Sequence, residues 1–256
     1  MGEHIKLKQQ DGVLEIIFAR PDKKNALCNA MYDEARGALE SAQTNNAIRV
    51  VLFSAEGDAF TAGNDVTEFA DVANGRANEL KAHGFIQALA QAEKPIVAAV
   101  PGLAVGVGTT MLLHCDLVYV AEAARLVTPF VNLGLVPEAA SSLLLPALIG
   151  HVRAFAMFAL GESISGAEAV ALGIANKMLP VADVLPAARA AATTLAQKPA
   201  ASLVSTKRLM REVAPLLARI DEEALIFTER LKSDEAREAL RAFVERRPAD
   251  FSKFKR

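Results

Sequence analysis

Short apolar runs separated by helix-length segments constrain the fold of this chain more than any other feature. Residues 48–54, 96–100 and 116–120 form such runs, and each carries at most one charged side chain. Runs of this length are typical of strands buried inside a sheet. The segments between them are long enough for helices, so the first half of the chain predicts an α/β sheet with crossover connections.

The start of this α/β body has recognisable turn and capping signals. Residues 5–9 and 13–18 predict a hairpin around Asp11 and Gly12. Asn29 is expected to cap a helix that continues to about residue 44. These elements place a hairpin and a first helix ahead of the buried runs.

The second half of the chain has a helical pattern, with glycines and prolines at the expected helix ends. Ser165 and Glu168 have the spacing of a capping box. We therefore expect an α/β core over residues 1–198 and a helical region over residues 199–256. Besides the helix that begins near Asn29 and the helix that this capping box begins and Gly173 ends, the expected helices span residues 78–93, 107–114, 139–149, 152–160, 183–196, 200–213, 215–232 and 233–246.

The composition argues against several classes of protein. A formal net charge of −2 gives no broad basic surface for nucleic acid or an anionic membrane. Cys28 and Cys115 have no metal-ligand spacing, which favours two thiols in a reducing compartment and no metal site. Residues 95–113 are uncharged, but Pro101 and three glycines interrupt them, which favours a strand and a turn over a membrane span. Without a recognisable secretory signal, we expect a cytoplasmic protein.

Three glycine-bearing segments, at residues 60–65, 100–108 and 128–138, could carry chemistry. In the second, glycines precede a predicted helix whose first N–H groups have no partner inside the helix. Such amides favour negative charge, either a phosphate or an oxyanion. The spacing is neither a dinucleotide fingerprint nor a P-loop. Close packing of a helix against a strand would also explain the glycines.

Glu138 is the candidate acid–base residue of the third segment. It follows Pro137 and is expected to open a helix of small residues. Apolar neighbours would raise the pKa of its carboxyl group and make it a better base toward a weakly acidic carbon. The alternative is a carboxylate that simply complements the dipole at the start of that helix.

Taken together, these segments resemble the crotonase superfamily. The similarity lies at residues 62–65, 94–102 and 132–137, and it is also recognisable at 20–27 and 242–248. The resemblance implies a ββα spiral core with a C-terminal helical trimerisation region, in a homotrimer or a dimer of trimers. It also implies an acyl-CoA thioester substrate, with coenzyme A as part of that substrate and no separate cofactor.

The resemblance assigns roles to individual positions. Two backbone N–H groups, those of Asn64 and Val107, would form the oxyanion hole for the thioester oxygen. The residues that would line the coenzyme A moiety are Lys24, Ala26, Leu27, Ala62, Gly63, Asp65, Val66 and Gly106.

The reaction depends on which carboxylates are present. Hydratases of the superfamily use two glutamates, and those positions fall at Thr110 and Phe130 here. Neither side chain can activate water as a carboxylate pair can. The third segment more closely resembles the peroxisomal-type Δ3,Δ2-enoyl-CoA isomerases, in which one glutamate, at the position of Glu138, acts alone. The resemblance therefore implies isomerisation of 3-enoyl-CoA to trans-2-enoyl-CoA.

Two alternatives to the isomerase are open at this point. The first is an enoyl-CoA hydratase with another acid–base pair. The second is a non-catalytic module that binds acyl-CoA or a protein partner. The helical region also carries apolar residues near helical spacing that must pack on the body or on another subunit; they are Phe227, Leu231, Leu240, Phe243 and Val244.

Overall fold

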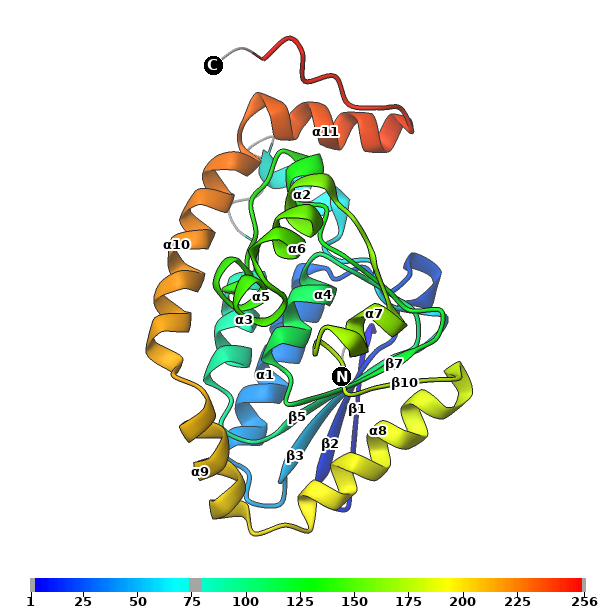
Figure 1. Cartoon of the computed structure of the whole chain (residues 1–256), viewed down its shortest axis with the longest axis vertical. Coiled ribbons are helices and arrows are strands. Elements are labelled where there is room, and N and C mark those ends of the chain that lie inside the picture. Colours follow the sequence, from blue (N-terminus) through cyan, green and yellow to red (C-terminus); the bar gives the residue numbers. More distant parts are fainter. Residues whose placement is uncertain (1–2, 74–79, 255–256) are drawn as a thin grey trace.

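The computed structural model describes residues 3–73 and 80–254 and contains two sheets surrounded by helices (Figure 1). The larger sheet has six strands in the order β1-β2-β3-β5-β7-β10. Its neighbouring strands are parallel except for the β1–β2 hairpin. The strands are β1 (Ile5–Gln10), β2 (Val13–Phe18), β3 (Val50–Ala55), β5 (Ile96–Val100), β7 (Leu117–Ala121) and β10 (Lys177–Leu179).

A smaller sheet of four strands follows the order β4-β6-β8-β9. The chain enters it directly after β3, β5 and β7, and then continues into a helical segment each time. This repeated β-β-α pattern confirms the expected spiral core. Sequence analysis did not predict these strands, because two or three residues are too few to show a period. They are β4 (Ala59–Thr61), β6 (Leu103–Val105), β8 (Arg125–Val127) and β9 (Ile164–Ser165).

Helices cover both faces of the larger sheet. On one face, α8 (Val181–Ala196) packs through small residues such as Ala188 against Leu52 of β3. On the other face, α1 (Asn29–Thr44) and α3 (Ala82–Gln91) share a core with Phe53. Successive residues of β3 therefore serve two different cores, as the alternation of side chains along a strand requires.

The C-terminal helices lie against this body. In Figure 1, α10 (Val213–Leu231) runs beside α3, and α11 (Asp234–Glu245) crosses above α2 (Val66–Ala73). The boundary expected at residue 198 falls between α8 and α9 (Ala200–Met210). The remaining helical elements are η1 (Pro21–Lys23), α4 (Val107–Thr110), η2 (Met111–His114), η3 (Val131–Leu133), α5 (Ser141–Ile149), α6 (His151–Phe155), η4 (Ala156–Leu160) and α7 (Gly166–Ala171).

Several expected helix boundaries are wrong. Asn29 is the first residue of α1 rather than its cap; Cys28 occupies the N-cap, and the Asn29 side chain instead accepts a bond from the Lys81 amide at 2.8 Å. The helix expected from residue 78 begins at Ala82, and residues 78–79 lie outside the described part. The capping box at the start of α7 is confirmed.

The helix expected from residue 139 begins only at Ser141. Ala139 and Ala140 have φ angles of 62° and 53°, in the left-handed region that interrupts a right-handed helix. Glu138 is therefore separated from the start of α5 by a left-handed turn and does not open the helix.

In the part of the chain that the structure describes, no helix is both long and apolar enough to cross a bilayer. The uncharged residues 95–113 form β5, a turn, β6, α4 and part of η2, as their prolines and glycines predicted.

Candidate active site

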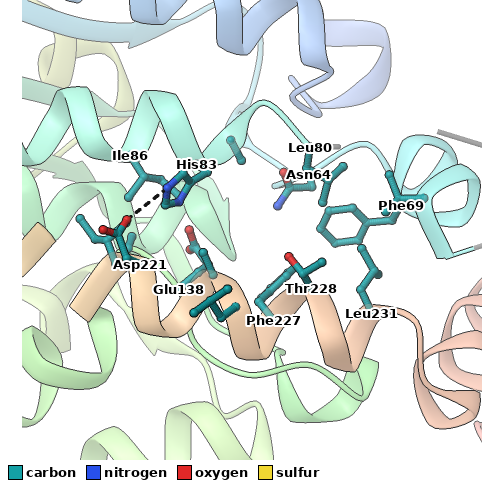
Figure 2. Close-up of a pocket in the computed structure, with 16 residues that line it drawn as sticks. Asn64, Phe69, Leu80, His83, Ile86, Glu138, Asp221, Phe227, Thr228 and Leu231 are labelled. Atoms are coloured by element: carbon teal, nitrogen blue, oxygen red, sulfur yellow. Dashed lines mark ion pairs between the residues drawn. The ribbon is translucent and has the colours of Figure 1, made fainter. Parts of the chain in front are cut away.

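Two cavities meet beside the second sheet. The first has a volume of about 500 Å³, contains Glu138 in its wall, and is bordered by α3 and α10 (Figure 2). The second, of about 350 Å³, runs along the glycine segments. They share Asn64, Phe69 and Phe227, so together they form one extended site. Most of the first cavity's lining is apolar, and includes Val72, Leu80, Ala82, Ile86, Ala139, Ile220, Ala224, Leu225 and Leu231.

Glu138 is a buried carboxyl group at this site. Its Oε1 accepts a hydrogen bond from the Thr110 hydroxyl, and its Oε2 has no hydrogen-bond partner among the described residues. The pKa of Glu138 is raised to about 8: burial raises it most, the Thr110 hydrogen bond opposes the rise, and the nearby Glu223 carboxylate adds to it. A carboxyl group with a pKa in this range can both accept and return a proton near neutral pH.

The left-handed turn after Glu138 rules out the simpler role considered for it. No acidic residue lies in the first turn of α5. The buried Glu223 of α10 accepts hydrogen bonds there instead, from the amide of Ala140 at 2.6 Å and that of Ser142 at 3.0 Å. Glu223 thus supplies the negative charge at the start of α5, and the Glu138 carboxyl group lies in the wall of the first cavity.

Of the two residues predicted to supply oxyanion-hole amides, Asn64 lines both cavities, whereas Val107 is buried and lines neither. Asn64 forms a parallel β-bridge with Leu27. The two hydrogen bonds of this bridge join the Leu27 amide to the Gly63 carbonyl (2.8 Å) and the Asp65 amide to the Leu27 carbonyl (2.9 Å). The Asn64 N–H is therefore left out of the bridge. Val107 is the first residue of α4, where an N–H has no partner within the helix. Neither amide has a backbone acceptor among the described residues.

Glycines bring these two amides together. A Cβ on Gly63 would lie 2.8 Å from the Val105 carbonyl oxygen, so only glycine permits the close approach of these two segments. Gly106 has a φ of 55° but open space where a Cβ would stand. It is required for its backbone conformation, while Gly108, whose Cβ would lie 2.5 Å from Thr61, is required for packing. The packing explanation is therefore confirmed at Gly108, while a role of the amides in binding negative charge stays a prediction.

The second cavity collects four of the residues predicted to line coenzyme A, namely Ala62, Gly63, Val66 and Gly106. Asp65 is placed differently. Its carboxylate pairs with Arg20 at 2.7 Å and accepts from the hydroxyl and the amide of Thr67. These interactions lower the pKa of Asp65 against the opposing effect of burial. Asp65 thus stabilises the start of α2 and is not part of either cavity wall.

Lys24, Ala26 and Leu27 lie beside this segment without lining either cavity. The Ala62 amide donates to the Lys24 carbonyl at 2.8 Å, and the Leu27 side chain is buried in the core. Their contacts support the residues of the second cavity through the backbone. A role in contacting coenzyme A remains a prediction for these three positions.

The two positions where hydratases carry glutamates face the site with other side chains. The hydroxyl of Thr110 donates to Glu138, and Phe130 lines the second cavity and packs against Phe158. The other carboxylate in the wall of the first cavity, Asp221, is exposed at its rim and pairs with His83 at 3.3 Å (Figure 2). The first cavity therefore has one buried carboxyl group, Glu138, in a wall that also contains Asn64.

Sequence reasoning missed several residues of the site. Glu223 lies on an amphipathic helix, where one more acidic residue does not indicate a site. Tyr32 has no motif around it in the sequence, but its hydroxyl donates to the Asn64 side chain at 2.6 Å. Phe227 and Leu231 were predicted only as apolar residues near helical spacing, with no role in the site. They line the first cavity because α10 packs beside α3.

A spiral of ββα units with a buried carboxyl group in a cavity wall defines the class of protein to which this chain belongs. The sequence profile described as "Enoyl-CoA hydratase/isomerase" matches residues 8–254. The chain is therefore a member of the enoyl-CoA hydratase/isomerase family, which confirms the resemblance to the crotonase superfamily.

Individual relatives agree with this assignment. The chain is 33% identical to rat "Enoyl-CoA delta isomerase 2" over 95% of its own length, but it spans only 64% of that protein. It is 32% identical to a "Probable enoyl-CoA hydratase" of Bacillus subtilis (strain 168), covering 94% of this chain and 96% of the relative. A crystal structure of an enoyl-CoA hydratase/isomerase from Pseudoalteromonas atlantica T6c superposes with a TM-score of 0.92 at 36% identity, covering 97% of this chain and all of the other.

Proposed function

We propose that this protein is an enoyl-CoA isomerase that converts 3-enoyl-CoA into trans-2-enoyl-CoA. The observation that carries the proposal is Glu138, a buried carboxyl group with a free oxygen, in a cavity that also contains Asn64. The relatives include both isomerases and a probable hydratase, so the choice of reaction depends on the site itself. One carboxyl group suffices for isomerisation, because no water is added.

The proposed mechanism moves one proton and shifts one double bond. The Glu138 carboxylate removes a proton from C2 of the 3-enoyl thioester. The electron pair of the broken C–H bond delocalises into the thioester and gives a dienolate whose negative charge lies mainly on the thioester oxygen. The amides of Asn64 and Val107 donate hydrogen bonds to this oxygen. Protonated Glu138 then gives its proton to C4, and the double bond becomes C2–C3.

The hydrogen bond from Thr110 and the burial of Glu138 have opposite effects on the pKa of this proton carrier. The Thr110 hydroxyl favours the ionised form of Glu138, and its surroundings favour the protonated form. A much lower pKa of Glu138 would slow the removal of the proton from C2, and a much higher pKa would slow its return to C4. Removal of one oxyanion donor typically costs about 10²–10³ in rate, so both amides are expected to contribute.

The competing reactions are separated by supplying the purified protein with a 3-enoyl-CoA and, separately, with crotonyl-CoA. We expect formation of the trans-2-enoyl thioester from the first and little hydration of the second. Hydration of crotonyl-CoA at a rate equal to or above isomerisation would replace the isomerase with a hydratase. Binding of acyl-CoA without turnover of either compound would favour the non-catalytic module.

We further propose that the protein assembles as a homotrimer or a dimer of trimers. This proposal follows from the family resemblance and is supported by apolar side chains left exposed on the helical elements. Phe155 and Leu160 are 59% and 66% exposed, and Phe243 and Val244 of α11 are 61% and 70% exposed. Burial of such side chains against another subunit would be favourable. Sedimentation equilibrium would measure the mass, and a monomer at micromolar concentration would contradict the proposal.

A further inference from the structure

The turn that follows Glu138 requires support from elsewhere in the fold. Ala139 and Ala140 both have positive φ, a backbone conformation that is unfavourable for residues with a Cβ. Two such residues in succession persist only where the surroundings hold them. The direction of the Glu138 side chain depends on this turn, because it lies immediately before it.

Glu223 holds the amide side of the turn. Its carboxylate is only 5% exposed and accepts from the amides of Ala140 and Ser142, at 2.6 and 3.0 Å. The two oxygens each take one amide, so the carboxylate is fixed in two directions. Glu223 comes from α10, the helix that also lines the first cavity.

His114 holds the carbonyl side of the same turn. Its Nε2 lies 2.7 Å from the Ala139 carbonyl oxygen, and its Nδ1 contacts the Arg211 guanidinium. A guanidinium can only donate, so Nδ1 is the acceptor and Nε2 carries the proton that it donates to Ala139. Burial, together with the Arg211 charge, lowers the pKa of His114 to about 3, so the ring stays neutral.

We propose that Glu223 and His114 are positioning residues that hold the left-handed turn from its two sides and thereby fix the Glu138 carboxyl group in the cavity wall. The inference rests on the proposed function, in which Glu138 carries the proton. It assigns a task to two buried groups that do not themselves contact the reacting carbons. It also links the geometry of Glu138 to α10.

Glu223 has an electrostatic effect as well as a geometric one, since its negative charge makes ionisation of Glu138 harder. Other titratable groups face the same region. Tyr32 of α1 interacts with the Glu138 charge, and His114 of η2 stays neutral. Asp221 and His83 line the rim of the cavity, and Arg219 of α10 acts on Glu223. Of these groups, Glu223 is the one whose charge raises the pKa of Glu138.

The test is Glu223→Gln, with Glu229→Gln as the matched loss of one exposed charge on α10. The glutamine offers one acceptor oxygen in place of two and carries no charge. We expect kcat for isomerisation to fall roughly tenfold with little change in KM, because a misplaced base loses rate rather than binding. The acid limb of the kcat/KM profile should move to lower pH by about half a unit or more, because Glu138 ionises more easily without the neighbouring charge. Glu229→Gln should resemble wild type in both respects.

A folded Glu223→Gln variant that lacks either the fall in kcat or the shift of the acid limb overturns the inference. If this variant does not fold, the reciprocal measurement decides. The carboxyl ¹³C resonance of Glu223 is titrated in wild type and in Glu138→Gln, and its midpoint should be lower in the variant. An unchanged midpoint would overturn the inference. This titration uses no substrate, so a protein with coupled carboxyl groups and no isomerase activity would refute the proposed function alone.

Discussion

The two sides of the candidate active site are built by different means. On one side, the N–H groups of Asn64 and Val107 are presented by backbone, and Gly63 and Gly106 permit the necessary conformations. On the other side, a single side chain, Glu138, is placed by a turn whose partners come from distant parts of the chain. The amide side thus depends on local residues, and the carboxyl side depends on tertiary packing.

This difference explains how each side can be altered. The backbone N–H remains whatever side chain replaces the native one, except proline, so other substitutions disrupt the amide side only by changing the backbone conformation. The carboxyl side is sensitive to one atom of Glu138 and to the charges around it, because a buried charge interacts strongly with its neighbours. Different substitutions can therefore alter the amide side and the carboxyl side independently.

The largest effect is expected for Glu138→Gln. The amide keeps the size of the side chain and its contact with Thr110, but it cannot accept and return a proton. We expect kcat for isomerisation to fall by about 10³ or more, at the upper range for general acid–base catalysis. Acyl-CoA affinity, measured by calorimetry, should change little. An activity close to that of wild type would refute the assignment of Glu138.

The amide side is tested by Gly106→Ala. A Cβ at this position meets no atom within 4 Å, so the substitution opposes only the backbone conformation with φ of 55°. We expect Val107 to turn away from the oxyanion position and kcat/KM to fall by about 10², as for loss of one donor.

Gly37→Ala is the matched control for this variant, because Gly37 also has open space around a Cβ but lies within the helix α1. It should keep full activity and gain up to about 1 kcal/mol of stability. Equal loss of activity in both variants would show that the effect is not specific to the oxyanion side.

The cost of burying Glu138 predicts a pH-dependent difference in stability. The pKa of this group is raised to about 8 in the folded protein, above an unfolded value of about 4.3. Between these values the native state binds more protons, so its free energy of unfolding falls as pH rises. Glu138→Gln removes this effect. We expect the variant to gain a few kcal/mol relative to wild type between pH 5 and pH 9 in urea unfolding. A pH-independent difference would contradict the burial of an ionisable group here.

The smallest effect is expected for Tyr32→Phe. The Tyr32 hydroxyl donates to the side chain of Asn64 at 2.6 Å, which helps to orient the residue that supplies one amide. Since the amide itself remains, we expect kcat to fall by less than tenfold, corresponding to about 1 kcal/mol. A loss as large as that of Gly106→Ala would mean that Tyr32 acts on the substrate rather than through Asn64.

Much of the fold followed from the sequence where the local pattern was strong. The buried runs became β3, β5 and β7, and the hairpin and the capping box of α7 were found as predicted. The strands of the second sheet were missed because two or three residues have no measurable period. The start of α5 was misplaced because small helix-forming residues at 139–140 adopt a left-handed turn that tertiary contacts impose.

The site was predicted in part for similar reasons. The positions of Asn64, Val107 and Glu138 followed from the family resemblance, and the structure brings Asn64 and Glu138 to one cavity. Asp65 forms an ion pair with Arg20 and lines neither cavity, so its contact with coenzyme A stays a prediction. An acidic residue in a glycine loop has the same local signal in both roles, and only the position of Arg20, 45 residues away in sequence, distinguishes them.

Residue identity and short-range patterns were enough to assign the family of this chain, the glycines of its loop segments and the absence of carboxylates at positions 110 and 130. The burial of Glu138, the contacts of Glu223 and His114 with its turn, and the place of α10 in the cavity wall became apparent only from the folded arrangement of the chain. Burial and charge coupling arise between segments far apart in the chain, and local sequence patterns do not indicate which segments come into contact.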